Sequence, residues 1–216
     1  MPNCRENSSL TDEGTPPSAG PGGKQTGFGI GMIPLSIDPK AVRVAVAGRG
    51  RPALARLKAL RAGGAESALF YCDRPNAGVI RALGDTLRPC LPDAAALGDL
   101  RLLWIAGLPD ATATALAGAA RRERVLVNVE DRPELCDFHS VAEVRRGDLL
   151  LTVSTAGRSP GFAARIRARL GAEFGPEWAA RLEAIGAERD RWRRQRRPMR
   201  ELANLTDAAI DRAGWL

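Results

Sequence analysis

The fold of this chain is decided by residues 42–53, which read Val-Arg-Val-Ala-Val-Ala-Gly-Arg-Gly-Arg-Pro-Ala. Three valines recur at every second position in this stretch, as they do in a β-strand. The turn Gly48-Arg-Gly50 follows at once, and Pro52–Arg61 then carries leucines on one side and a proline in its first turn, as a helix does. The stretch therefore predicts a strand, a tight turn and a helix.

The same order of strand and helix repeats downstream. Short apolar runs at Ser67–Cys72, Leu102–Ala106 and Val125–Val129 predict further strands. Between them, Asn76–Leu83 and Asp110–Arg122 have helical patterns, the latter with its first residue as a candidate cap. Buried strands that alternate with helices indicate βαβ units with right-handed crossovers. The predicted fold class is therefore α/β, with a parallel sheet of the Rossmann type.

The alternation ends after Asp131. Val141–Arg145 and Leu149–Ser154 predict two strands joined by a turn, and helical patterns follow at Gly161–Phe174 and Glu177–Arg197. We therefore expect four parts: a disordered N-terminal extension (residues 1–31), a Rossmann-type domain (32–143), a small α+β segment (144–176) and a C-terminal helical segment (177–216).

Composition narrows the class of protein. Its 44% hydrophobic and 26% charged residues are ordinary for a soluble globular chain. No apolar run approaches the ~18–20 residues of a membrane span and no secretory signal is visible, so we expect a cytoplasmic protein without a membrane partner. The four cysteines form no C-x-x-C pair and there is one histidine, so no metal site is expected. The net charge of +7 suits an anionic partner, whether nucleic acid, membrane surface or polycarboxylate ligand.

The turn Gly48-x-Gly50-x-x-Ala53 carries the first functional signal. Its first glycine permits a tight turn, its second lets the backbone approach a pyrophosphate, and Ala53 lets the helix pack close to the sheet. The helix N-terminus attracts phosphate charge, and Arg49 fits a loop that faces an anion. A tight turn without a ligand is the alternative interpretation.

Asp73 carries a second signal, because it ends the second predicted strand. It follows Gly48 by 25 residues, near the spacing of ~20 at which a carboxylate holds the ribose 2′-hydroxyl of a dinucleotide. Such a carboxylate would select NAD over NADP, since it would repel a 2′-phosphate. The alternative is an ordinary loop aspartate before a turn.

Two further stretches offer polar groups where a ligand would bind. Val127-Asn-Val-Glu-Asp131 leaves a predicted strand at its carboxyl end, the end at which open α/β sheets bind ligands, so Asp131 is a candidate general base. Ser154-Thr-Ala-Gly-Arg-Ser-Pro160 offers hydroxyls and backbone amides that suit a carboxylate or phosphate. A turn residue and a simple helix start are the respective alternatives.

Six stretches together carry a resemblance to a known family. They are Met32-Ile-Pro-Leu35, Val46-Ala-Gly-Arg-Gly50, Val127-Asn-Val-Glu-Asp131, Leu135-Cys-Asp-Phe138, Val144-Arg-Arg-Gly-Asp-Leu149 and Val153-Ser-Thr-Ala-Gly-Arg-Ser-Pro160. In order and spacing they resemble the bifunctional precorrin-2 dehydrogenase/sirohydrochlorin ferrochelatase family, the N-terminal module of siroheme synthase. The likeness covers roughly residues 32–200. The last three stretches are the most specific, because a generic Rossmann domain lacks them.

The resemblance implies a reaction. NAD+ would remove a hydride from precorrin-2, a reduced tetrapyrrole that bears many carboxylates, to give sirohydrochlorin. In many members the same site also inserts Fe2+, as a substrate, to give siroheme. Asp131 matches the aspartate that is proposed to serve both steps. The family is dimeric, so segment 144–176 is expected to join two subunits of a homodimer.

The resemblance and the motifs also assign binding residues. We expect NAD to contact Gly48, Arg49, Gly50, Ala53, Asp73, Ala106 and Gly107. We expect the tetrapyrrole to contact Asn128, Ser154, Thr155, Arg158 and Ser159. One departure from the family stands out, because Ala106-Gly-Leu-Pro-Asp110 replaces a small-Thr-Asp-Asp stretch that lies beside the cofactor.

Two other classes of function stay open. The altered stretch at residues 106–110 favours a non-catalytic regulatory relative that binds NAD or a tetrapyrrole, whereas the retained Asp131 argues for an enzyme. The arginines within Glu177–Arg197 would suit a nucleic acid, but Trp192 is the only aromatic ring among them, so no nucleic-acid partner is expected.

Overall fold

The computed structural model describes residues 31–216, which divide into two compact units. The first unit ends at His139 and the second comprises Ser140–Leu216. The predicted disordered extension lies outside the described residues, apart from Gly31, and the predicted divisions after residues 143 and 176 remain predictions.

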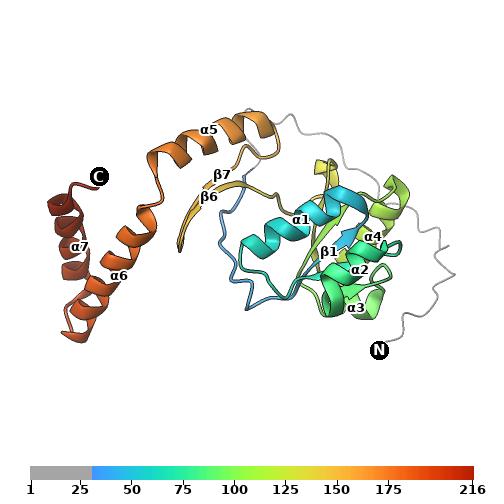
Figure 1. Ribbon diagram of the computed structural model, residues 1–216, viewed down its shortest axis with the longest axis horizontal. Coiled ribbons are helices and arrows are strands. Elements are labelled where there is room, and N and C mark those ends of the chain that lie inside the picture. The colour runs from blue at the N-terminus through green and yellow to red at the C-terminus, as the bar shows by residue number, and fades with distance from the viewer. Residues whose placement is uncertain (1–30) are drawn as a thin grey trace, which may run out of the picture. The chain divides into compact units, whose positions relative to one another are not determined.

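The first unit is built on a five-stranded, entirely parallel sheet (Figure 1). The strands are β1 (Val44–Gly48), β2 (Leu69–Tyr71), β3 (Leu87–Arg88), β4 (Leu102–Ala106) and β5 (Leu126–Val129). Their order in the sheet is β3-β2-β1-β4-β5, so the chain leaves the centre in one direction and returns to it to build the other half. This arrangement confirms the predicted α/β fold of the Rossmann type.

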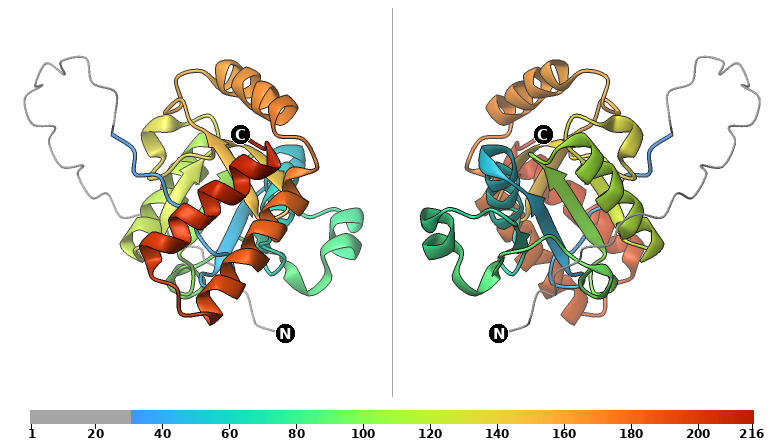
Figure 2. Two further views of the ribbon diagram at one scale, coloured as in Figure 1. Left: turned by 90° about the vertical axis from the view of Figure 1, so that its left-hand side faces the viewer. Right: turned by 90° about the vertical axis from the view of Figure 1, so that its right-hand side faces the viewer.

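Helices cover both faces of this sheet. They are α1 (Gly50–Ala62), α2 (Ala77–Leu83), α3 (Ala94–Gly98) and α4 (Asp110–Arg122), with short 3₁₀ turns η1 (Gly84–Thr86) and η2 (Pro133–Leu135). Strand β1 alternates between the two faces: Val46 packs with Leu57 of α1, and Ala47 packs with Leu116 of α4. The right-hand view of Figure 2 shows β1 and β4 between α1 and α4. Because it is covered on both sides, β1 is buried at every position.

Gly48 is required where β1 ends. A Cβ built there would lie 1.9 Å from the carbonyl oxygen of Ala106 on β4 and 2.8 Å from the Cβ of Ala53 on α1. Helix α1 therefore packs close to the sheet because both Gly48 and Ala53 are small, as the sequence pattern predicted.

The second unit pairs two strands and adds three helices. Strands β6 (Ala142–Arg146) and β7 (Leu149–Val153) are antiparallel, and Gly147 has a φ of 57° in the turn between them. The helices are α5 (Pro160–Glu173), α6 (Trp178–Arg194) and α7 (Met199–Ala213). The buried hydrophobic residues of this unit, within the described chain, are Val144, Ala163 and Leu202. Few hydrophobic side chains of this unit are therefore buried.

The structure corrects the sequence expectations in three places. Asp110 lies in the first turn of α4 and Pro109 is the N-cap, so Asp110 is not the cap. The helix expected to run to Arg197 ends at Arg194, since Arg196 has a left-handed φ of 57° and Pro198 is the N-cap of the next helix, α7. The sequence pattern predicts no strand at β3, because two residues are too few to produce a periodic pattern.

Across residues 31–216, none of the helices combines the length and the apolar character needed to cross a membrane.

Gly48→Ala tests the packing at the end of β1. The new methyl group would overlap a backbone oxygen that cannot move without parting β1 from β4, so we expect a loss of about 3 kcal/mol or more in unfolding free energy. Urea denaturation followed by circular dichroism measures this loss.

Gly186→Ala is the matched control, because no atom lies within 4 Å of the Cβ position there and the residue sits inside α6. Removing a helical glycine should leave stability unchanged or raise it by about 0.5–1 kcal/mol. Equal effects of the two substitutions would contradict the packing argument.

Candidate functional site

The carboxyl ends of three adjacent strands form the candidate site. Strand β4 lies between β1 and β5, so the turns that follow these strands open at one edge of the sheet. Two backbone hydrogen bonds join them: Arg49 N donates to Ala106 O at 3.1 Å, and Glu130 N donates to Ile105 O at 2.9 Å. The glycine turn and Asp131 therefore share an edge, although Gly48 and Asp131 are 83 residues apart in the chain.

The glycine turn is shaped by close backbone contact with β4. Gly50 and Gly107 have left-handed φ values of 67° and 65°. A Cβ on Gly107 would lie 2.2 Å from the carbonyl oxygen of Arg49, so only glycine fits there. The stretch after β4 thus packs directly against the glycine turn through Ala106 and Gly107. These are two of the residues for which the sequence predicts a contact with the cofactor.

The N-terminus of α1 offers backbone N–H groups to an anion. No side chain caps this end and its first turn holds no acidic residue. By contrast, Asn76 caps α2 by accepting a hydrogen bond from Val79 N at 2.9 Å. An open turn between two close backbones, followed by an uncapped helix start, fits the pyrophosphate of a dinucleotide.

Arg49 and Asp73 form a forked ion pair beside the turn. Arg49 Nε donates to one carboxylate oxygen of Asp73 at 2.7 Å, and Nη2 donates to the other at 2.5 Å. About a quarter of each side chain is exposed, at 24% and 29%. These hydrogen bonds from Arg49 lower the pKa of Asp73, with the positive charge adding to the effect, so Asp73 is ionised. The sequence placed both residues near the cofactor but did not indicate that they pair.

Asp131 follows β5 in a left-handed turn. Its φ is 56°, which aspartate tolerates better than most residues, and Arg132 N closes the turn on Val129 O at 3.3 Å. The residue is exposed, and among residues 31–216 its carboxylate has no hydrogen-bond or ion-pair partner. Asp131 therefore presents a carboxylate that no neighbouring cation neutralises.

The neighbouring Arg132 ties the Asp131 turn to the start of α4. Its guanidinium lies 3.2 Å from Asp110 and forms a second ion pair with Glu134. The hydrogen bond from Arg132 lowers the pKa of Glu134. Asp110, the last residue of the altered stretch, is thus engaged with this arginine.

Segment 136–138 closes the outer edge of β5. Asp137 N donates to Val127 O at 2.8 Å, and the Asp137 carboxylate accepts from Val127 N at 2.9 Å. The Cys136 sulfur accepts from Val129 N at 3.2 Å, and the amide of Asn128 donates to Phe138 O at 2.8 Å. The polar groups of an edge strand are therefore satisfied by the chain that follows it.

Asn128 and Cys136 both take part in hydrogen bonds that hold this segment against β5. Asn128 is buried and its amide nitrogen is committed to Phe138, while its predicted contact with substrate stays a prediction. Burial raises the pKa of Cys136, so its thiol stays protonated at neutral pH and serves as a hydrogen-bonding group. From the sequence, Leu135-Cys-Asp-Phe138 contributes only to the family resemblance. Its hydrogen bonds to β5 could not be predicted, because a pattern of residue types does not reveal backbone partners.

The predicted substrate loop lies in the second unit, at the start of α5. Ser159 caps the helix by accepting from Phe162 N at 3.3 Å, and Thr155 exchanges hydrogen bonds of 3.2 Å with the Ser159 backbone. Ser154 Oγ accepts from Ala156 N at 3.2 Å. The loop thus has the helix-start geometry that was the alternative interpretation. Contacts of these residues and of the exposed Arg158 with substrate stay predictions.

The second unit and the described chain as a whole show two further features. Arg146 donates to Gly171 O and Phe174 O, so it completes the end of α5. Among residues 31–216 no group of three or more His, Cys, Asp or Glu side chains is arranged to hold a metal.

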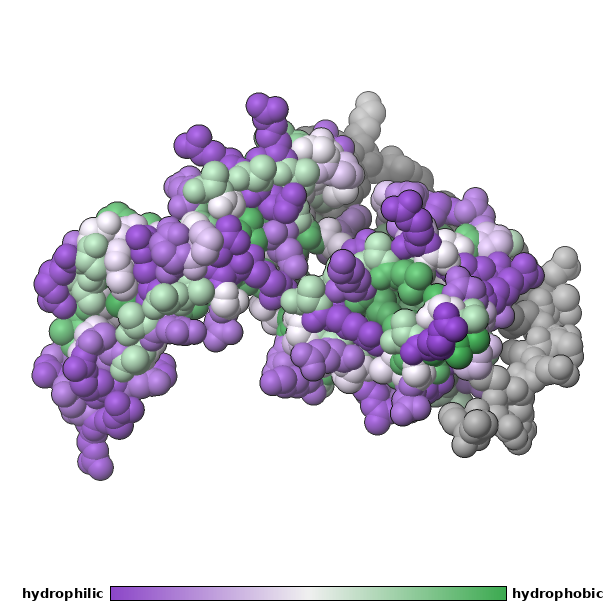
Figure 3. All heavy atoms as spheres, in the orientation of Figure 1, coloured by the Kyte–Doolittle hydropathy of each residue, from purple (hydrophilic) through white to green (hydrophobic). Residues whose placement is uncertain are grey.

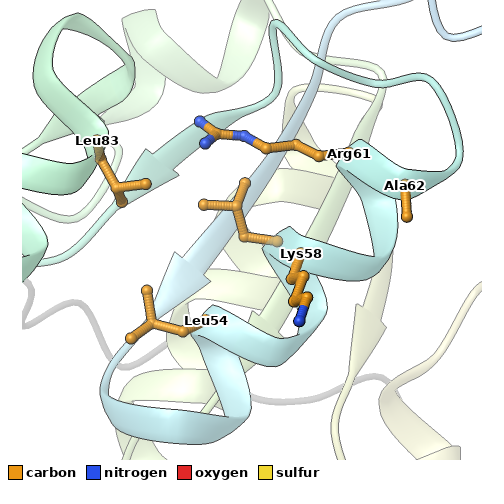
Figure 4. Close-up of a pocket in the computed structure, with 6 residues that line it drawn as sticks. Leu54, Lys58, Arg61, Ala62 and Leu83 are labelled. Carbon is orange, nitrogen blue, oxygen red and sulfur yellow. The ribbon is translucent and has the colours of Figure 1, made fainter.

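A cavity of about 360 Å³ lies along α1 and is closed on its other side by Leu83 of α2. Figure 4 shows Leu54, Lys58 and Arg61 along α1 with Leu83 facing them, and the hydrophobic area over α1 and α2 is green in Figure 3.

Comparison with known proteins agrees with this geometry. A family model described as "Putative NAD(P)-binding" matches residues 35–142, half of the chain. Siroheme synthase of Methylococcus capsulatus is 33% identical over 142 residues, covering 64% of this chain and 30% of the relative. Siroheme synthase of Azotobacter vinelandii is 35% identical over 145 residues, with the same shares of 64% and 30%. The chain therefore spans about a third of the length of these curated relatives.

A solved structure matches over most of the chain. "SirC, precorrin-2 dehydrogenase" is similar with a TM-score of 0.65 at 22% identity, covering 86% of this chain and 92% of that one. This likeness shows the fold. The family model and the curated relatives bear out the family resemblance predicted from the six stretches.

Cys136→Ala tests the closure of the β5 edge. The substitution removes the acceptor of Val129 N in a partly buried place, so we expect a loss of about 1–3 kcal/mol in unfolding free energy. Cys136→Ser is the control, since a hydroxyl both accepts and donates and should restore much of the loss. If alanine and serine were equally stable, the hydrogen bonds of the thiol would not contribute; urea denaturation of both variants decides.

Proposed function

We propose that this chain, which belongs to the NAD(P)-binding family matched over residues 35–142, is a dehydrogenase that oxidises precorrin-2 to sirohydrochlorin with NAD+. The names of its relatives, siroheme synthase and precorrin-2 dehydrogenase, supply the substrate. The observation that carries the proposal is the shared sheet edge, to which the glycine turn, the open start of α1 and the carboxylate of Asp131, without a partner among residues 31–216, all belong.

The residues of this edge suit hydride removal. When bound, NAD+ accepts the hydride that leaves a ring carbon of the substrate. The backbone N–H groups that begin α1 hold the pyrophosphate, and the turn at Gly48 and Gly50 lets it come close. Asp131 takes the proton that leaves the neighbouring ring atom, and a double bond forms between the two ring atoms. Because Asp131 is exposed, it passes that proton on to water.

A substrate with many carboxylates needs positive charge. Arg132 is partly exposed beside Asp131, although it already contacts Asp110 and Glu134. Arg158 is exposed in the loop before α5. The net charge of +7 adds a long-range attraction for a polyanion. We assign Asn128, Ser154, Thr155, Arg158 and Ser159 to substrate contact on this proposal, with Arg158 as the charged member.

Asp131→Asn tests the proposed base. The amide cannot accept a proton, so we expect turnover of precorrin-2 with NAD+ to fall by about 10²–10⁴-fold while NAD+ affinity is retained. NADH and sirohydrochlorin absorbance report turnover, and calorimetric titration reports NAD+ affinity. Asp99→Asn is the control, because Asp99 pairs with Arg43 at the opposite edge of the sheet. It should leave both turnover and NAD+ affinity unchanged. Full turnover by Asp131→Asn would remove Asp131 from the proposed role.

Insertion of Fe2+ into sirohydrochlorin is the second reaction that we propose for this edge. It requires an acceptor for ring N–H protons, and the exposed carboxylate of Asp131, which has no ion-pair partner within the described part of the chain, supplies one. Fe2+ is a substrate in this step. Adding Fe2+ to sirohydrochlorin without NAD+ measures insertion apart from dehydrogenation, and Asp131→Asn should lose both activities if one carboxylate serves both.

We further propose that the protein is a homodimer joined through the second unit, residues 140–216. In the described chain this unit buries three hydrophobic residues, Val144, Ala163 and Leu202, and each of its two strands has an unpaired outer edge. A two-stranded sheet is marginal alone, so a second copy would add the missing buried surface.

Light scattering of the full chain at micromolar concentration tests the dimer. The expected mass is twice that of the 23.1 kDa chain. A single monomer mass over this concentration range would contradict assembly through the second unit.

A further inference from the structure

The ion pair of Arg49 and Asp73 joins two groups that dinucleotide sites commonly use for opposite purposes. A carboxylate at the end of the second strand accepts the ribose 2′-hydroxyl of NAD, whereas a nearby arginine accommodates the 2′-phosphate of NADP. Asp73 follows β2 and Arg49 lies in the turn after the adjacent β1, so both stand at the edge of the sheet that holds the glycine turn. This chain has both groups, and they are bonded to one another.

The pair leaves binding capacity on each partner. The carboxylate of Asp73 receives two hydrogen bonds from Arg49 and has lone pairs left for a ribose hydroxyl. Arg49 uses Nε and Nη2 on Asp73, so the N–H groups of Nη1 remain as donors for a phosphate oxygen. Either form of the ribose therefore finds a partner.

The pair also changes the charge that a 2′-phosphate meets. An unpaired aspartate would repel the phosphate, which is why the sequence alone predicted selection of NAD. In the pair, the guanidinium lies against the carboxylate at 2.5–2.7 Å and the two charges sum to zero. Both side chains are about a quarter exposed, so a ligand can reach them.

We propose that this pair lets the site bind NADP+ as well as NAD+, with Arg49 as the residue that sets the ratio of the two affinities. The inference rests on the dinucleotide site of the proposed function. It adds that Asp73 does not exclude the 2′-phosphate of NADP+ as long as Arg49 is paired with it.

Calorimetric titration of the full chain with NAD+ and with NADP+ tests the proposal. In the unmodified protein the two dissociation constants should agree within about tenfold. In Arg49→Ala the carboxylate of Asp73 loses its partner, so the ratio of the NADP+ constant to the NAD+ constant should rise by at least about tenfold. In Asp73→Asn the repelling charge is gone and Arg49 is released, so the ratio should fall below that of the unmodified protein.

Arg51→Ala is the matched control. Arg51 is exposed in the same segment and has the same charge, but it has no bond to Asp73. Its loss should weaken both dinucleotides to a similar degree and leave their ratio unchanged. Arg49→Lys adds a test of geometry, since it keeps the charge without the fork and should give an intermediate ratio.

The outcomes separate this inference from the proposed function. Tight NAD+ binding with NADP+ weaker by more than about a hundredfold, or a ratio that Arg49→Ala leaves unchanged, would overturn the inference alone. Binding of both dinucleotides without turnover of precorrin-2 would support the inference and overturn the dehydrogenase proposal. Failure of both NAD+ and NADP+ to bind would overturn the inference and the dehydrogenase proposal together.

Discussion

The site depends on one close approach of two backbones, where the turn after β1 lies against the end of β4. Gly48 and Gly107 are the residues that allow it, since a side chain on either would overlap a carbonyl oxygen of the facing segment. The hydrogen bond from Arg49 N to Ala106 O holds the contact. Because β4 sits between β1 and β5, the same contact brings the glycine turn to the edge at which Asp131 emerges.

On the Asp131 side of the edge, side chains rather than a neighbouring strand hold the chain in place. Strand β5 is the last of the sheet and has no neighbouring strand on its outer side. Cys136 and Asp137 supply the missing partners, and this folds the chain back along β5. The intervening turn must then carry Asp131 out to solvent in a left-handed conformation. The exposure of the carboxylate is thus a consequence of how the edge strand is closed.

Electrostatics divides the charged residues of this edge into two groups. Arg49 and Asp73 neutralise one another beside the glycine turn, and Arg132 is shared between Asp110 and Glu134. Asp131 has no such partner in the described chain. A base must be able to take up a proton, and a carboxylate already bonded to a cation has fewer lone pairs free to accept one. The difference in partners therefore matches the different roles that we propose for these groups.

The sequence by itself determined the α/β fold class, the glycine turn and the edge at which Asp131 would lie, because these follow from local periodicity and from the common direction of parallel strands. It also determined the family, through stretches such as Leu135-Cys-Asp-Phe138 that a generic Rossmann domain lacks. Only the tertiary structure decided that Arg49 is bonded to Asp73, that the Asn128 amide holds Phe138, and that Cys136 closes β5. Each of these is a contact between residues distant in the chain or on crossing segments. A pattern of residue types records which side chains can bond, whereas the folded backbone chooses which of them meet.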